Sequence, residues 1–304
     1  MSDRGKTNRR VFLTAAAATA GAISTTGASF VGQTKEATSE PPTIQEVIDR
    51  IIKDTTGKPL PPETCDTLKT GDPSQKVTGI VTTFRSTFAV LRKARELGAN
   101  LVVTHEPTFY NHYDKVDWLQ GDPAYGVKRK LIDEAGIAIW RFHDYWHSAK
   151  PDGIIRALAR RLDLRQIDPE NKRLYTISEL TFAELCRRCK KLFGITHLMA
   201  VGDPEMLCRR VGVFAGWGGN FGQEHVEMFI NQGVDAVISG EAAEWTGSVY
   251  ARDAITAGFK KGLIALGHAA SEEPGMEDAA EWLRVRFPGV RIVHVPALSP
   301  FEVI

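Results

Sequence analysis

The sequence predicts an α/β protein made of two α/β domains with mostly parallel sheets, and three observations support this class. Short apolar runs alternate with helical patterns of roughly 10–15 residues, which is the rhythm of βαβ units. Polar residues that can bind a metal follow several of the apolar runs, where ligands of open α/β sheets gather. The composition, 43% hydrophobic and 25% charged over 304 residues, is that of a globular protein with a large core.

The first forty residues differ from the rest of the chain. Basic residues before Leu13 are followed by a soft stretch rich in Ala, Gly and Thr, which is the order of a secretory signal. The segment Asn8-Arg9-Arg10-Val11-Phe12-Leu13-Thr14 resembles a twin-arginine motif. We therefore expect residues 1–28 to be a twin-arginine signal peptide, residues 29–43 to be a linker, and the protein to be exported to the periplasm or the extracellular space.

Residues 44–168 are expected to form the N-terminal α/β domain. Ile44–Asp54 has apolar residues at helical spacing and predicts a helix, whereas Thr55–Pro73 is rich in Pro, Gly and Thr and predicts a loop. The other helices expected here are Phe88–Leu97, Ala124–Ala135 and Gly153–Leu162, and the strands are Val77–Thr82, Leu101–Thr104 and Ile137–Phe142.

Residues 169–304 are expected to form the C-terminal α/β domain. Thr181 begins a helix that runs to Phe193, and Glu184 completes a capping box. Further helices are expected near Glu224–Gln232, Trp245–Ala257 and Met276–Phe287, and strands near His197–Val201, Arg210–Phe214, Asp235–Ile238, Gly262–Leu266 and Arg291–Val295.

Charge and composition exclude several classes of partner. A formal net charge of +1 argues against a general nucleic-acid binder, which needs a basic surface. Without residues 1–28, which hold four basic residues and one acidic residue, the charge falls to −2. No run of 18 truly apolar residues predicts stable membrane insertion, and four Cys do not make a disulfide scaffold. The expected partner is a small-molecule substrate.

Three predicted strands end in residues that can bind a metal ion. The first strand is followed directly by a His-Glu pair, and the other two by a His with a second donor four residues later. The six candidates are His105, Glu106, His143, His147, His268 and Glu272. Imidazole nitrogen and carboxylate oxygen suit Zn²⁺, Mn²⁺ or Fe²⁺. Because six donors exceed the need of one tetrahedral ion, the set predicts two divalent ions that activate water.

Each of these histidines taken alone could equally be a solvated loop residue or a buried core residue. The joint pattern of three strand ends and two four-residue spacings favours metal binding. Glu241, at the end of another predicted strand, is a candidate general base or a residue that orients a ligand. The Gly-rich segment 214–220 could bring backbone N–H groups close to an anion, or it could be a simple turn.

Four separated motifs resemble, in the same order, those of the Nif-three-like family, whose members are also labelled type-two GTP cyclohydrolase I homologues. They are Thr-His-Glu-Pro-x-Phe at 104–109, the His143–His147 pair, Ser239-Gly240-Glu241, and Gly-His-x-x-Ser-Glu at 267–272. The resemblance covers roughly residues 75–300. It implies two α/β domains, a dinuclear metal site in the cleft between them, and a homo-oligomer in the form of a hexameric ring.

Two positions depart from the family motifs. The first motif normally reads Thr-His-His-Pro, and Glu106 stands at its second His; the second motif normally ends in Asp, and His147 stands there. One imidazole and one carboxylate thus exchange places, and the set keeps four imidazoles and two carboxylates. We interpret this as a rearranged site. Asp144 is a competing oxygen donor, ranked second because the neighbour of His143 on a strand would point the other way.

The leading hypothesis for function is an exported hydrolase, of cyclohydrolase or amidohydrolase type, that depends on two metal ions and attacks a C–N or ester-type bond of a small molecule. The alternative is a metal-binding protein without turnover, such as a metal store, a chaperone or an assembly ring. A coordination position open to a pocket would favour the enzyme, and saturated coordination would favour the alternative.

Overall fold

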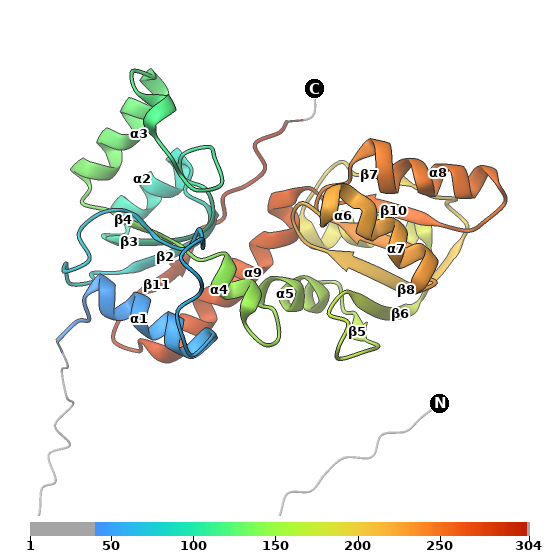
Figure 1. Ribbon diagram of the computed structural model, residues 1–304, viewed down its shortest axis with the longest axis horizontal. Coiled ribbons are helices and arrows are strands. Elements are labelled where there is room, and N and C mark those ends of the chain that lie inside the picture. The colour runs from blue at the N-terminus through green and yellow to red at the C-terminus, as the bar shows by residue number, and fades with distance from the viewer. Residues whose placement is uncertain (1–39, 303–304) are drawn as a thin grey trace, which may run out of the picture. The chain divides into compact units, whose positions relative to one another are not determined.

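The computed structural model describes residues 40–302 (Figure 1). The expected signal peptide and most of the expected linker therefore lie outside the described residues. Within residues 40–302 the fold is mixed α/β with two sheets, as the sequence predicts. None of the helices in this range combines the length and the apolar character needed to cross a membrane.

The first sheet contains five strands in the spatial order β1-β4-β3-β2-β11. Its strands are β1 (Leu68–Thr70), β2 (Ile80–Arg85), β3 (Leu101–Glu106), β4 (Ala138–Arg141) and β11 (Ile292–His294). All pairs are parallel except β1–β4. The inner strands are buried on both faces, which explains their continuous apolar runs. The short β1 lies in a segment expected to be a loop.

The second sheet contains six strands in the order β5-β6-β8-β9-β10-β7. Its strands are β5 (Arg165–Gln166), β6 (Leu174–Thr181), β7 (Met199–Val201), β8 (Leu207–Phe214), β9 (Ala236–Ser239) and β10 (Gly262–Ala265). The pairs β8–β9 and β9–β10 are parallel and the other pairs are antiparallel. This sheet is therefore mixed rather than mostly parallel, because β6 forms where no strand is expected and pairs antiparallel with β8.

Helices connect the strands of both sheets. They are α1 (Ile44–Thr55), α2 (Phe88–Glu96), α3 (Pro123–Glu134), α4 (Asp144–Ser148), α5 (Gly153–Arg161), α6 (Phe182–Phe193), α7 (Gln223–Asn231), α8 (Val249–Thr256) and α9 (His268–Arg286). Three shorter turns of helix are η1 (Asp117–Leu119), η2 (Asn220–Gly222) and η3 (Glu244–Ser248), the last a π-helix. The predicted capping box of α6 is confirmed, since Thr181 and Glu184 bond each other's backbone N–H groups.

The C-terminal segment returns to the first sheet. Helix α9 packs beside α5 between the two sheets, and β11 then pairs with β2 (Figure 1). Strand membership thus differs from the expected division at residues 168/169 in two places, β5 and β11. Helix α9 begins at His268, eight residues before the expected start, and continues through Pro274. At Gly275 a Cβ atom would overlap Ile154 of α5, so the glycine permits the close approach of these helices.

An ion pair joins the first helix to the last. Asp54 of α1 accepts hydrogen bonds from Arg286 of α9 (2.9 Å) and from Arg50 (2.8 Å). Burial by itself raises the pKa of Asp54, but the two guanidinium groups outweigh it and lower the pKa below the ordinary 3.8. The pair therefore stabilises the fold above pH 3.8, and this contribution is lost as the pH falls through the lowered pKa.

We expect Asp54→Asn to reduce the free energy of unfolding at pH 7 by up to about 1 kcal/mol, and to reduce it less at pH 3. Urea unfolding at both pH values measures the effect. Asp49→Asn, on the same helix and bonded only to Gln45 among the described residues, is the control. An equal loss at both pH values would show that the Asp54 charge does not contribute.

Candidate metal centre

The predicted donors come together where the carboxyl ends of strands from both sheets meet. His105 and Glu106 are the last residues of β3, and His143 follows β4 as the N-cap of α4. His147 lies on the same helix four residues later, hence on the same face. His268 opens α9 after β10, and Glu272 lies one turn along it. The sequence thus places the donors at strand ends, and the fold brings these ends together.

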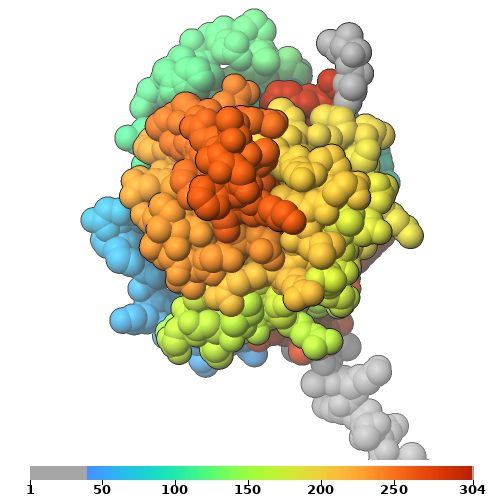
Figure 2. Space-filling model, turned by 90° about the vertical axis from the view of Figure 1, so that its right-hand side faces the viewer, coloured from blue at the N-terminus to red at the C-terminus, as the bar shows by residue number. Residues whose placement is uncertain are grey.

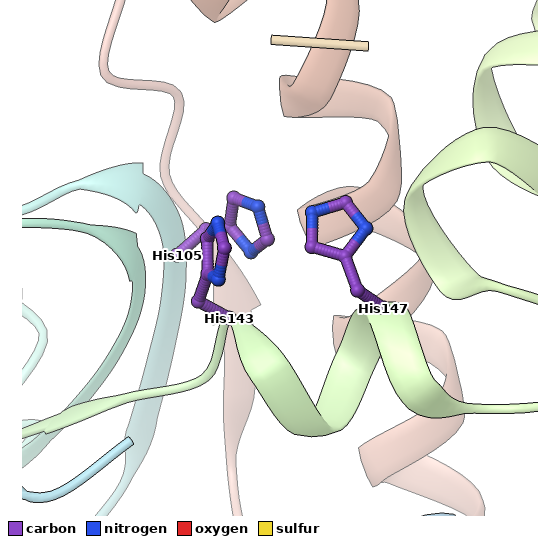
Figure 3. A group of neighbouring side chains, drawn as sticks. All are labelled: His105, His143 and His147. Atoms are coloured by element: carbon purple, nitrogen blue, oxygen red, sulfur yellow. The ribbon is translucent and has the colours of Figure 1, made fainter. Parts of the chain in front are cut away.

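Three imidazole rings form the first part of the cluster. His105, His143 and His147 turn their rings toward a common space (Figure 3), with ring centroids 4.7–5.1 Å apart. Each offers a ring nitrogen within 4.8 Å of the others. Figure 3 also shows that His143 and His147 rise from opposite ends of α4. A spacing of this kind suits a shared metal ion better than it suits three independent side chains.

The two predicted glutamates bridge the histidines. Glu272 Oε2 lies 3.4 Å from His105 Nε2 and 3.1 Å from His268 Nε2. Glu106 Oε1 lies 3.7 Å from the Nε2 atoms of both His143 and His268. Each carboxylate therefore faces two imidazoles. All six predicted donors lie in one connected cluster, which we call the donor cluster.

An oxygen atom faces the Nδ1 atom of every histidine in the donor cluster. The partners are Phe142 O for His105 (3.0 Å), Asp144 Oδ1 for His143 (2.8 Å), Asp152 Oδ2 for His147 (3.2 Å) and Glu241 Oε1 for His268 (3.3 Å). When Nδ1 donates its proton to oxygen, Nε2 keeps its lone pair and is free to bind a metal. The four rings are therefore oriented in the same way, with Nδ1 toward an oxygen atom and Nε2 left for a metal.

This pattern assigns roles to three acidic residues around the cluster. Glu241, predicted as an orienting residue or general base, lies against His268. The Asp144 carboxylate faces His143 Nδ1. The expectation that the Asp144 side chain points away from the site is therefore wrong, because His143 caps a helix and does not lie on a strand. The other oxygen of Asp144 accepts from Thr64 Oγ1 and Cys65 N, which fixes the carboxylate. Asp152 was not predicted, since its link to His147 exists only in the fold.

Arg141 holds Glu106 in place. Its guanidinium is fully buried and donates from Nη2 to Glu106 Oε2 (3.1 Å), from Nε to the His105 carbonyl and from Nη1 to the His112 carbonyl (3.2 Å). One Glu106 oxygen is thereby neutralised, and the other faces the histidines. The only local signal for this role is a basic residue inside a buried strand, where an unpaired charge is costly.

Burial and charge set the protonation of the cluster. Burial, with His143 and His147 nearby, holds the pKa of His105 well below its ordinary value, so this ring is a neutral donor. Burial alone would lower the pKa of His268 also, but its hydrogen bonds to Glu241 and Glu272 raise it to about 10. In the metal-free protein a proton on His268 therefore offsets the carboxylates.

Cys65 lies near His143 and Asp144 and could complete an alternative donor group. Burial raises the pKa of its thiol far above the ordinary value, so it stays protonated. Because the thiolate is the form that binds metal, this group is a poorer site than the donor cluster.

Asp152 offers a test of the orienting contacts. Its Oδ1 caps α5 by accepting from Ile154 N and Ile155 N, while Oδ2 accepts from Lys172 Nζ (2.7 Å) and faces His147. Asp152→Asn can keep the cap, but then its NH₂ group faces His147 Nδ1. His147 must then carry its proton on Nε2 or lose its anchor. We expect a metal affinity lower by about 10–100-fold, measured by chelator competition.

Asp122→Asn is the matched control for this variant. The Asp122 side chain caps α3 by accepting a hydrogen bond from Tyr125 N, and it has no histidine as a hydrogen-bond partner among the described residues. Equal metal affinity of the two variants would contradict the orienting role of Asp152.

A Gly-rich turn closes one side of the donor cluster. Gly216 has a φ of +59°, and a Cβ atom there would overlap Glu272 Oε1 and lie 2.8 Å from His268 Nε2. Its N–H donates to Ser271 Oγ (2.9 Å), and its carbonyl accepts from Glu241 N (2.7 Å). The turn therefore packs its bare backbone against the metal donors, a placement that the sequence left open.

Comparison with known proteins agrees with this architecture. The profile of the Duf34/NIF3 (NGG1p interacting factor 3) family matches residues 66–299. A protein named "GTP cyclohydrolase 1 type 2 homolog" from Clostridium perfringens is 24% identical over 249 residues, 78% of this chain and 90% of that protein. A protein of the same name from Escherichia coli K12 is 28% identical over 218 residues, 69% of this chain and 80% of that protein.

Solved structures show the same fold. A Bacillus cereus protein related to NIF3 superposes with a TM-score of 0.69 at 16% identity, covering 88% of this chain and 100% of that one. Reduced HcgD from Methanocaldococcus jannaschii gives a TM-score of 0.60 at 19% identity, covering 83% and 97%. At these identities the likeness concerns the fold alone.

Proposed function

Because the chain belongs to the Duf34/NIF3 family, and because its donor cluster is built from both sheets, we propose that it is a metal-dependent hydrolase of small molecules. The observation that carries the proposal is the shared orientation of the four histidines. Their Nδ1 atoms face oxygen, the Nε2 atoms of His105, His143 and His268 lie 3.1–3.7 Å from Glu106 or Glu272, and His147 offers a ring nitrogen to the other two imidazoles of its group.

The residues fit divalent ions. His105 Nε2 is buried and has no hydrogen-bond partner among the described residues, although buried ring nitrogens are normally satisfied. The donor set is four imidazoles and two carboxylates without thiolate, which suits Zn²⁺, Mn²⁺ or Fe²⁺. With two carboxylates that each face two histidines, we propose two ions. When bound, such ions polarise a substrate and lower the pKa of water.

The residues of the chain provide the rest of the chemistry. Arg141 and the Nδ1 partners fix the donors before a substrate arrives, which reduces the reorganisation needed for reaction. The hydrogen bond with His268 lowers the pKa of Glu241, although burial opposes it, so its carboxylate is ionised at neutral pH. Glu241 also has a side chain 40% exposed and can accept a proton from water that enters the site.

The partial solvent exposure of the donor cluster supports a catalytic metal site rather than a closed metal-storage site. The side chains of His105 and Glu272 are buried, whereas those of His143, His147 and His268 are 23–29% exposed. One side of the cluster is thus accessible to solvent. A storage site with saturated coordination needs no such opening.

The test is a hydrolase panel on the metal-loaded full chain. The panel contains esters, linear amides and ring amides or amidines, the last because relatives carry a cyclohydrolase name. We expect turnover of one class and about two ions per chain by mass spectrometry. Stoichiometric metal with no turnover on any class would overturn the hydrolase and favour the non-catalytic alternative.

We further propose that the protein is exported by the twin-arginine route. The support is the paired Arg9 and Arg10 ahead of a mild apolar stretch. Cell fractionation of the protein with both residues replaced by Lys should show retention in the cytoplasm. Equal export of the variant would contradict the proposal. The homo-oligomer implied by the family resemblance is tested by light scattering on the same preparation.

A further inference from the structure

Three exposed aromatic rings lie side by side on the second sheet's side of the chain. Trp217, Phe221 and Trp245 are 53%, 58% and 70% exposed. The Trp217 and Phe221 rings are perpendicular with centroids 5.8 Å apart, and Trp245 lies 6.3 Å from Phe221. We call these three rings the aromatic corner. Trp217 and Phe221 follow the carboxyl end of β8 and Trp245 follows that of β9, whereas Figure 2 shows the end of the second sheet that lies away from the first sheet.

The aromatic corner is held by an unusual backbone. Residues 218–222 all have positive φ, including Asn220 and Phe221, which carry side chains. Left-handed backbone costs a non-glycine residue roughly 1–2 kcal/mol. Thr246 Oγ1 donates to Phe221 O (2.7 Å), which ties this turn to the π-helix η3 that carries Trp245. Left-handed strain and π-helices both occur preferentially at functional sites.

The aromatic corner adjoins the donor cluster through the chain itself. Trp217 follows Gly216, whose backbone packs against Glu272 and His268. Trp245 follows Glu241 by four residues, and Glu241 N donates to the Gly216 carbonyl. The two segments that carry the rings are therefore hydrogen-bonded to each other beside the donors. Both segments that carry the rings therefore begin beside the donor cluster.

The charge of these segments selects among aromatic ligands. Residues 211–250 contain no Lys or Arg, and the segment that carries Trp245 contains Glu241, which faces His268, and Glu244, which directly precedes Trp245. Arg173, which packs over the Phe214 ring, is paired with Glu224. The faces of aromatic rings are themselves negative. An anionic ring would be repelled here, and a neutral or cationic ring would be attracted.

We propose that the aromatic corner binds a flat conjugated ring that is neutral or positively charged. Resting on the proposed hydrolase function, it is the subsite that holds the ring of the substrate while the bond to be cleaved lies beside Glu241 and His268. Trp217, Phe221 and Trp245 are thus specificity-determining residues. The substrate class is a small aromatic or heteroaromatic compound with a hydrolysable bond attached to its ring.

Calorimetric titration of the full chain with three bicyclic probes tests the ring binding. The probes are quinoline (neutral), 1-methylquinolinium (cationic) and quinoline-3-carboxylate (anionic). We expect the first two to bind and the third to bind at least about tenfold more weakly. Trp245→Leu and Phe221→Leu should each weaken binding of 1-methylquinolinium roughly tenfold. Trp118→Leu, an exposed tryptophan outside the aromatic corner, should bind as the unmodified protein does.

Three outcomes would overturn the proposal: equal affinity for the anionic probe, equal affinity of the Leu variants, or no binding of any probe. Light scattering on the same variants examines the other occupant, a second copy of the chain. Dissociation of Trp245→Leu into smaller species with unchanged probe affinity would assign the rings to an interface and would overturn the ring subsite.

The two proposals fail separately. If the probes bind as expected but the metal-loaded chain hydrolyses nothing, only the hydrolase is overturned. If hydrolysis is found, Trp245→Leu should raise KM for an aromatic substrate with little change in kcat, and should leave the metal content intact. Hydrolysis with KM unchanged in this variant would overturn the ring subsite alone.

Discussion

His268→Ala is expected to lower the metal affinity of the chain by more than about a hundredfold and to abolish metal-dependent activity. His268 Nε2 is the atom that lies near both Glu272 (3.1 Å) and Glu106 (3.7 Å), so its loss separates the two carboxylate bridges. Outer partners of metal ligands alone are worth about 10–100-fold in affinity, and a direct donor should exceed this range. Metal content after dialysis against a graded chelator series measures the effect.

His197→Ala is the matched control for this variant, because His197 is exposed and lies before β7, outside the donor cluster. His268 is itself partly exposed, so its removal should leave the fold intact, and thermal unfolding of the metal-free proteins verifies this. Retention of two ions per chain in His268→Ala would contradict its place among the ligands.

Gly216→Ala is expected to disrupt the donor cluster without removing any donor. The added Cβ would overlap Glu272 Oε1 and crowd His268 Nε2, so either the glutamate or the turn must move. Metal geometry tolerates little displacement, and we expect affinity to fall by at least about tenfold. The positive φ adds strain of roughly 1–2 kcal/mol, which should appear as a lower melting temperature. Chelator competition and thermal unfolding measure the two effects.

Gly194→Ala separates these effects. Gly194 ends α6 with a φ of +63°, close to that of Gly216, but a Cβ there meets nothing within 4 Å. It should therefore show the same loss of thermal stability with normal metal affinity. If both variants bind metal normally, the close packing of Gly216 against the donors is not required for the site.

The elements predicted best from the sequence are those with strong local patterns. The helix α1, expected over Ile44–Asp54, forms over Ile44–Thr55 with the expected apolar residues facing the core. Strands β3 and β4 were visible as apolar runs because parallel central strands are buried on both faces. In contrast, β1 and β6 are held by pairing with distant strands, and their own residues carry little periodic signal.

The start of α9 shows a limit of local patterns. Pro274 and Gly275 both disfavour a helix interior, and the expected helix began after them at Met276. In the fold, Gly275 accepts a hydrogen bond from Trp146 Nε1 (3.0 Å) and packs against Ile154. These contacts outweigh the weak local preference. As a result, His268 and Glu272 lie one turn apart on one helix face, which a loop would not ensure.

Residue type and local periodicity are enough to identify which donors are available and that they follow strands. The nitrogen of each ring that faces the common space is set by contacts that form when the chain folds. That choice depends on Phe142 for His105, Asp152 for His147 and Glu241 for His268, and on the bare backbone of Gly216. Such contacts join residues of different elements, and local pattern carries no information about them. The chemistry of the site therefore follows from the local sequence, whereas the geometry of the site follows from the packing of different elements against each other.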